Sequence, residues 1–151
     1  MLDRRAAILG SAAAFALSGS RLFAQPQGHV VEMTGRPGGD MSFSPRILRI
    51  ASGDTVTFRP ADPSHSCLST PGMLPEGAEG WRGSIGKPVT VTFDKPGFYG
   101  FHCLPHRSLG MVGLVIVDGS GRDANLAAAK AVKHPGKAAG VWKEIWLETE
   151  V

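Results

Sequence analysis

Short runs of alternating apolar and polar residues, separated by glycine and proline, fill most of the chain between residues 25 and 118. A period of two is that of a β-strand with one buried face, because successive side chains point to opposite faces. Such runs predict strands over residues 29–34, 43–50, 55–58, 89–93 and 98–103, and a nearly continuous apolar run predicts a buried strand over 111–117. Short strands and turns at this spacing are typical of an all-β sandwich or barrel.

Two connections between these runs differ in character. The sequence Asp94-Lys-Pro-Gly97 is typical of a turn, so we expect residues 89–93 and 98–103 to pair as a hairpin. The stretch from His65 to Val89 is irregular and rich in glycine and proline, which predicts a long surface excursion with a single helical turn.

The period changes to that of an α-helix beyond residue 118. An alanine-rich run extends from Asp123 to about residue 133, with Asp123 or Asn125 as its cap, and a second helical run ends near Leu147. Trp142 and Trp146 are four residues apart, which makes one face of the second run strongly apolar. We expect this face to cover the sandwich.

The domain organisation follows from length and from the first residues. The chain has 151 residues, of which 42% are hydrophobic and 19% are charged, and this suits a single domain. Arg4-Arg5, a short apolar run and a small residue are typical of an export signal over residues 1–24. A twin-arginine signal and a general secretory signal both account for these features. We expect one domain over 25–151, with the sandwich over 25–118 and a helical extension over 119–151.

Charge and hydropathy argue against two classes of partner. Without residues 1–24 the chain keeps 13 basic and 12 acidic residues, so the formal net charge of +3 falls to about +1. This balance does not favour a nucleic-acid-binding protein. The apolar run near the start is shorter than the roughly 20 residues that span a membrane, so we expect an exported protein without a membrane anchor.

Three side chains that bind soft metals lie close together where the predicted strands 98–103 and 111–117 meet. Cys103, His106 and Met111 offer a thiolate, an imidazole and a thioether, and His65 adds a second imidazole upstream. Two His, one Cys and a distant axial Met are the ligand types of a blue-copper electron-transfer site. Each residue alone would be ordinary, and it is their joint spacing that indicates a metal site.

The two cysteines of an exported chain also allow a Cys67–Cys103 disulfide. That pairing would consume the only thiolate available for a metal and would leave the spacing of His106 and Met111 unexplained. We expect instead a free, buried Cys67 and a metal-bound Cys103.

Several segments together resemble the pseudoazurins of the cupredoxin family. They are the loop Cys-x-Pro-His-x-x-x-Gly-Met at 103–111, Lys95-Pro-Gly-Phe-Tyr99, Met73-Leu-Pro-Glu-Gly-Ala-Glu79, Gly53-Asp-Thr-Val-Thr-Phe58 and the two C-terminal helices. The resemblance covers essentially all of residues 25–151. It implies an eight-stranded Greek-key sandwich and one type 1 copper ion, with the ligands His65, Cys103, His106 and Met111.

The same resemblance implies a periplasmic carrier that shuttles single electrons between Cu(I) and Cu(II), as a monomer. Its partners would be a periplasmic reductase such as copper nitrite reductase and a cytochrome c-type donor. A copper-binding or delivery protein without redox shuttling is the alternative. An enzyme is not expected, because His29, His102 and His134 are not spaced as a second copper set.

Two residues depart from the family pattern. Ser66 stands where the family generally has Asn, whose side chain and backbone steady the ligand loop. The resemblance therefore does not fix the reduction potential of the copper site. His102 stands where Lys is common, and strand alternation points it away from the metal, as a surface polar residue. Met41 resembles a methionine that packs near the exposed histidine ligand.

We expect electrons to pass through the edge of His106. The expected apolar patch around this edge comprises Leu104, Pro105, Gly110, Met41 and Pro45, and the expected basic rim comprises Arg82, Lys87, Arg107 and Arg46. Redox encounters use small interfaces, in which rim charges mainly set the association rate.

Overall fold

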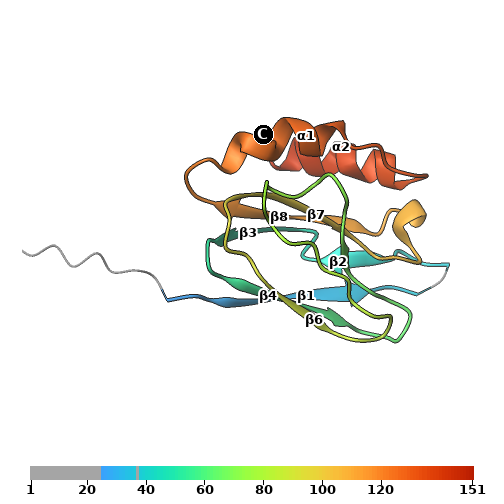
Figure 1. The fold of residues 1–151 in the computed structure, drawn as a ribbon. Coiled ribbons are helices and arrows are strands. Elements are labelled where there is room, and N and C mark those ends of the chain that lie inside the picture. The colour runs from blue at the N-terminus through green and yellow to red at the C-terminus, as the bar shows by residue number, and fades with distance from the viewer. Residues whose placement is uncertain (1–24, 37) are drawn as a thin grey trace, which may run out of the picture.

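The structure is a computed structural model that describes residues 25–36 and 38–151, so the predicted signal over 1–24 lies outside the described residues. Two four-stranded sheets face each other, and a helical layer covers one of them (Figure 1). The elements are β1 (Gly28–Thr34), β2 (Ser42–Ser44), β3 (Ile47–Ala51), β4 (Thr55–Pro60), β5 (Leu68–Ser69), β6 (Val89–Thr92), β7 (Gly97–His102), η1 (Arg107–Leu109), β8 (Val112–Asp118), η2 (Arg122–Asn125), α1 (Leu126–Ala131) and α2 (Ala138–Glu148).

The strand order mixes segments that are distant in the sequence. The first sheet has the order β2-β1-β4-β6 and the second the order β3-β8-β7-β5. The pairs β1–β4 and β3–β8 are parallel, and the other pairs are antiparallel. Since parallel neighbours cannot be joined by a tight turn, the chain must cross between the sheets. The predicted eight-stranded sandwich with two C-terminal helices is confirmed.

The predicted hairpin between residues 89–93 and 98–103 is wrong. β6 pairs with β4 in the first sheet, whereas β7 pairs with β8 and β5 in the second. The intervening turn therefore carries the chain across the sandwich. The rings of Phe93 and Tyr99, on either side of it, pack edge to face with centroids 4.9 Å apart, so aromatic packing between the sheets replaces cross-strand pairing. The expected stretch 43–50 is likewise divided at Pro45, with β2 in the first sheet and β3 in the second.

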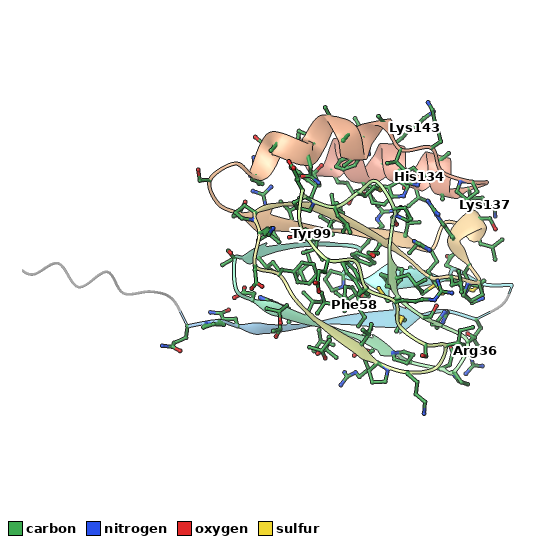
Figure 2. All side chains as sticks on the ribbon, in the orientation of Figure 1. Arg36, Phe58, Tyr99, His134, Lys137 and Lys143 are labelled. Carbon is green, nitrogen blue, oxygen red and sulfur yellow. The ribbon has the colours of Figure 1, made fainter. Side chains whose placement is uncertain are left out.

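Aromatic side chains between the sheets form the centre of the main core. The ring of Phe101 lies 4.7 Å from that of Phe43 and 4.9 Å from that of Phe58, both edge to face. Figure 2 shows Phe58 and Tyr99 between the two sheets. Tyr99, Phe101 and Cys103 all belong to this core, as expected for alternate positions along one strand. Alternation along β7 therefore turns Cys103 inward at the point where the strand ends.

The helical layer covers the outer face of the second sheet, as predicted. Trp142 and Ile145 of α2 pack with Phe98 and Ile116 of that sheet in a second core. The segment before α2 also reaches the loop after β7, because the Lys137 N–H donates to the carbonyl of Ser108 in η1 at 2.9 Å. None of the described helices is long and apolar enough to cross a membrane.

Two local predictions about this half of the chain fail. Neither Asp123 nor Asn125 caps a helix through its side chain; the Asn125 side chain instead bonds the backbone of Phe98, accepting from its N–H at 3.0 Å and donating to its carbonyl at 2.8 Å. The irregular stretch from 65 to 89, all of it described, contains the short β5 and an isolated bridge between Leu68 and Arg82, without the expected helical turn.

Candidate metal centre

The predicted ligands meet at one end of the sandwich, where two loops lie side by side. His65 is on the loop between β4 and β5, while Cys103, His106 and Met111 are on the loop between β7 and β8. This end is opposite the one at which the chain enters β1 (Figure 1). Each loop leaves the end of a strand, which gives the side chains a rigid base.

Backbone hydrogen bonds fold the second loop into a tight turn. The N–H of Cys103 donates to the carbonyl of Met111 at 3.0 Å, and the N–H of Met111 donates to the carbonyl of His106 at 3.2 Å. Gly110 has φ +97°, a left-handed conformation that suits glycine, and it lets the chain return to β8 within this short loop. Backbone hydrogen bonds among Cys103, His106 and Met111 therefore fix the relative positions of these three residues.

The potential ligand atoms have the separations of a three-coordinate set. The Sγ of Cys103 lies 4.0 Å from the Nδ1 of His65 and 3.5 Å from the Nδ1 of His106. All three atoms lie within 4.8 Å of one another. Metal–thiolate and metal–imidazole bonds of about 2.3 and 2.0 Å, as in zinc sites, place S and N about 3.6 Å apart at open bond angles. The two sulfur–nitrogen separations are therefore compatible with a single metal ion bound by all three side chains.

The His65 ring is oriented by acceptors on its far side. Its Nε2 lies 2.9 Å from the carbonyl oxygen of Gly35 and 3.2 Å from a carboxylate oxygen of Asp62. Both partners are acceptors, so Nε2 carries the proton and Nδ1, which faces the sulfur, has a free lone pair. The sequence analysis did not identify Asp62; its place three residues before His65 was the available signal.

The environment of Cys103 and His106 determines their protonation. Burial raises the pKa of the Cys103 thiol, and the N–H of Ser66, 3.5 Å from Sγ, acts against this shift. Burial, and then the neighbouring His65, lower the pKa of His106. A buried neutral imidazole is ready to bind a metal, whereas the buried thiol must lose its proton when a metal enters.

The fourth predicted ligand and the second cysteine are both buried. Met111 is fully buried directly beside the loop. Cys103 and Cys67 are both free, so the disulfide alternative is not supported, and the expectation of a free, buried Cys67 is confirmed. Burial raises the pKa of the Cys67 thiol well above its usual value, which makes this thiol unreactive.

The remaining histidines lie outside the cluster. Across the described residues, His65, Cys103 and His106 form the one group of His, Cys, Asp or Glu side chains able to share a metal. His102 is buried, contrary to the expectation of a surface residue: its Nδ1 lies 2.9 Å from the Thr70 hydroxyl, and burial lowers its pKa to about 4. Thr70 and the covering helices account for this burial, and the alternation of residues along the strand does not predict either of them.

The surface around His106 agrees in part with the expected patch. Leu104, Pro105 and Leu109 are exposed beside it, and His106 itself retains 9% exposure. Met41 lines a hollow of about 550 Å³ together with Leu109, Gly110 and Val141.

The expected basic rim needs correction at two positions. Arg46 forms ion pairs with Glu144 and Glu148 of α2, and burial lowers the pKa of the half-buried Arg107. Arg82 and Lys87 are exposed, and Arg36 and Lys137 are further exposed cations at this end of the molecule (Figure 2).

Comparison with known proteins agrees with this fold and cluster. The family model of copper binding proteins, plastocyanin/azurin family, matches residues 30–118. The chain therefore belongs to the plastocyanin/azurin family of copper-binding proteins. These proteins are electron carriers rather than enzymes, and the cluster of two imidazoles and a buried thiol fits the family's type 1 copper ion.

Within that family the similarity is to pseudoazurins. The chain is 40% identical over 134 residues to a pseudoazurin from Methylorubrum extorquens, with 89% of each chain covered. It is 41% identical over 111 residues to a pseudoazurin from Paracoccus pantotrophus, covering 73% of this chain and 75% of the relative. A solved pseudoazurin from Sinorhizobium is 40% identical with a TM-score of 0.75, and 82% of this chain and 97% of that one are covered. The resemblance seen in the sequence is confirmed.

Proposed function

We propose that this protein is a periplasmic carrier of single electrons, with His65, Cys103, His106 and Met111 as the four ligands of one type 1 copper ion. The observation that carries the proposal is the preformed cluster, in which two Nδ1 atoms face one buried sulfur. Four ligands leave no position for a substrate, which favours electron transfer over bond chemistry.

The protein's own contribution is to keep this geometry fixed. Bound copper supplies the one-electron couple. Gly35 and Asp62 hold the His65 ring, and backbone bonds among Cys103, His106 and Met111 hold the second loop. Since a rigid site changes little between oxidation states, less reorganisation opposes the transfer.

The exposed edge of His106 is the proposed port for electrons. Leu104, Pro105 and Leu109 offer a small apolar contact around it, and Arg82 and Lys87 belong to a segment bonded to the His65 loop through the Gly86 N–H. Such a surface suits a brief encounter with a protein of opposite charge.

The proposed partners are a periplasmic reductase such as copper nitrite reductase as acceptor and a cytochrome c-type protein as donor, with this protein acting as a monomer. Export through the signal at residues 1–24 would bring it to the periplasm.

The visible and EPR spectra of the oxidised, copper-loaded protein test the ligand set. We expect an intense visible thiolate-to-copper band and a reversible one-electron wave in voltammetry. Cys103→Ser should abolish the band, because a hydroxyl cannot replace the thiolate. The matched control is Cys67→Ala, which removes the other buried thiol and should leave the band in place. A colourless copper-loaded protein would support the delivery alternative and overturn the electron-carrier proposal.

The partner is tested separately by kinetics. Electron transfer to an acidic reductase should slow as ionic strength rises, because salt screens the basic rim. A rate independent of salt would contradict the role of the rim without affecting the ligand set.

A further inference from the structure

The turn that precedes α2 lies directly against the loop that carries three of the proposed ligands. The N–H of Lys137, which Figure 2 shows beside η1, donates to the carbonyl of Ser108 at 2.9 Å. Gly136 approaches the same carbonyl so closely that a Cβ at its position would overlap the oxygen. It also has φ +54°, a left-handed conformation that suits glycine. The absence of a side chain at Gly136 therefore permits this close contact between the two backbones.

A second contact with the same loop comes from the first turn of α2. A Cβ at Gly110 would lie 3.0 Å from the Cγ2 of Val141 and 3.7 Å from the Cβ of Lys137, so the backbone of Gly110 packs on this turn. Val141 itself packs against the second core, which joins α2 to the second sheet. The start of α2 is therefore fixed to the sandwich and contacts the loop at two points.

These contacts act on the residues between two proposed ligands. Ser108 and Gly110 lie between His106 and Met111. On the inner side of the loop, the carbonyl of His106 accepts from the N–H of Met111 at 3.2 Å. On the outer side, the bond from Lys137 to Ser108 is the one backbone hydrogen bond that joins the loop to the helical layer among the described residues. Without it, backbone hydrogen bonds would hold the loop from the inner side alone.

We propose that Gly136 and Lys137 are positioning residues that hold Ser108 and thereby fix where Met111 lies relative to the other ligands. A distant axial Met tunes a blue-copper site, so a displaced loop changes the properties of the bound ion even while all ligands stay attached. The helical layer therefore supports the metal site as well as the sandwich. This inference rests on the proposed function, since it concerns the same four-ligand site.

Lys137 offers a matched pair of variants. Its φ of −65° is the value that proline imposes, and proline is tolerated at the start of a helix. Lys137→Pro therefore removes the N–H that donates to Ser108 while the backbone keeps a conformation that suits α2. Lys137→Ala removes the same side chain and the same exposed charge but keeps the N–H. The difference between the two variants isolates the hydrogen bond to the loop.

The readouts are the EPR and visible spectra of the copper-loaded variants and their copper affinity in competition with a chelator. Lys137→Pro should change both spectra and bind copper about tenfold more weakly, because a support of the ligands is lost. Lys137→Ala should match the wild type in all three readouts. Wild-type spectra and affinity in Lys137→Pro overturn the inference, even if that variant is less stable, because α2 would then support only the fold.

Gly136→Ala tests the same contact while it keeps the N–H of Lys137. The new methyl group should displace Ser108 and change the spectra as Lys137→Pro does. Gly121→Ala is the matched control: Gly121 has φ +78°, but no described atom beyond its chain neighbours lies within 4 Å of the place of its Cβ. That variant therefore strains the backbone without touching the loop and should keep wild-type spectra. Wild-type spectra in Gly136→Ala would contradict the proposal.

Hydrogen exchange in the wild-type protein tests the proposal without any substitution. If the contact positions the ligands, ligation must in turn stabilise the contact, because coupling between two sites is reciprocal. The Lys137 amide should exchange about tenfold more slowly in the Cu(I) protein than in the metal-free protein. The Thr149 amide, at the far end of α2, is the control and should not change. Equal exchange at Lys137 in both forms overturns the inference, whereas a copper-loaded wild type without the intense visible band overturns the proposed function instead.

Discussion

At the scale of single residues, the orientation of His65 depends on groups that bind no metal. The carbonyl of Gly35 and the carboxylate of Asp62 both accept from the Nε2 side of the ring, which leaves Nδ1 free toward the sulfur. Partners of this kind keep a metal-binding histidine in the correct tautomer and orientation. Asp62 is itself held by the backbone N–H of Ser64 at 2.8 Å, so the loop forms a short chain of supports.

We expect Asp62→Ala to weaken copper binding about tenfold, the lower end of the range for such supports, because Gly35 still holds the ring. Competition with a chelator of known affinity measures this change. Asp94→Ala removes an exposed carboxylate from the turn between β6 and β7 and should bind copper like the wild type. Equal affinities in both variants would show that Asp62 does not orient His65.

His134 makes a residue-scale prediction about pH. It stacks on Trp142 with ring centroids 4.9 Å apart, and both of its ring nitrogens are buried without a hydrogen-bond partner among the residues that the structure describes. Burial, and then Arg107, lower its pKa to about 4, below the value of about 6.5 in an unfolded chain. Between these values only the unfolded state takes up the proton, so this histidine lowers the free energy of unfolding as pH falls from 6.5 to 4.

His134→Phe should remove this contribution while keeping the stacked ring. Urea unfolding at pH 7 and pH 5 should show a smaller loss of stability on acidification in the variant than in the wild type. The same loss in both proteins would contradict the role assigned to His134.

At the scale of elements, a side chain takes the place of a neighbouring strand along part of β7. Its residues 101 and 102 pair with β5, but Phe98 lies beyond that short strand. There the Asn125 side chain bonds both the N–H and the carbonyl of Phe98, as a neighbouring strand would. The last residue of η2 therefore fixes the start of the strand that leads to Cys103.

Asn125→Ala should lower the free energy of unfolding by about 2 kcal/mol, because two backbone groups of the buried Phe98 lose their partners. Denaturant titration measures this loss. Asn125→Asp keeps an acceptor for the N–H and should cost less, and the visible band of both copper-loaded variants should remain, since the change is at the far end of β7. Unchanged stability in the alanine variant would contradict this role.

The sequence allowed the existence of most strands and the ligand set to be predicted, because both depend on local spacing. Alternation marks a strand whatever it pairs with, and Cys103, His106 and Met111 share one loop. The sheet to which each strand belongs depends on contacts between distant residues, such as Phe93 with Tyr99. The burial of His102 could not be predicted for the same reason, whereas the support from Asp62 had a local signal in its place three residues before His65.

At the scale of the whole molecule, one buried carboxylate helps to anchor the end opposite the metal cluster. Asp54 accepts from the N–H of Gln27 at 2.8 Å and lies 2.8 Å from the Nε2 of His29, so it anchors the start of β1. The bond from Gln27, followed by that from His29, holds the pKa of Asp54 below its usual value. A depressed carboxyl pKa gives stability that is complete above the unfolded pKa of about 3.9 and is lost as pH falls through the folded pKa.

Asp54→Asn should therefore be less stable than the wild type at pH 7, and the difference should shrink in acid below about pH 4. Thermal unfolding across this range measures it, with the exposed Asp94→Asn as the control. A difference that stays constant with pH would show that the charge of Asp54 is not what stabilises the fold.

The two ligand loops also affect how copper acts on the folding equilibrium. Three of the four proposed ligands lie within residues 103–111, so an unfolded chain still offers a local chelate to the ion. Any affinity of the unfolded chain subtracts from the stabilisation that a bound metal gives to the native state. The folded state adds the docking of His65 from the other loop and the backbone bonds that hold Cys103, His106 and Met111 in place. Copper will thus raise the melting temperature by less than its native affinity alone implies, and a chain that has not yet folded already competes for the metal.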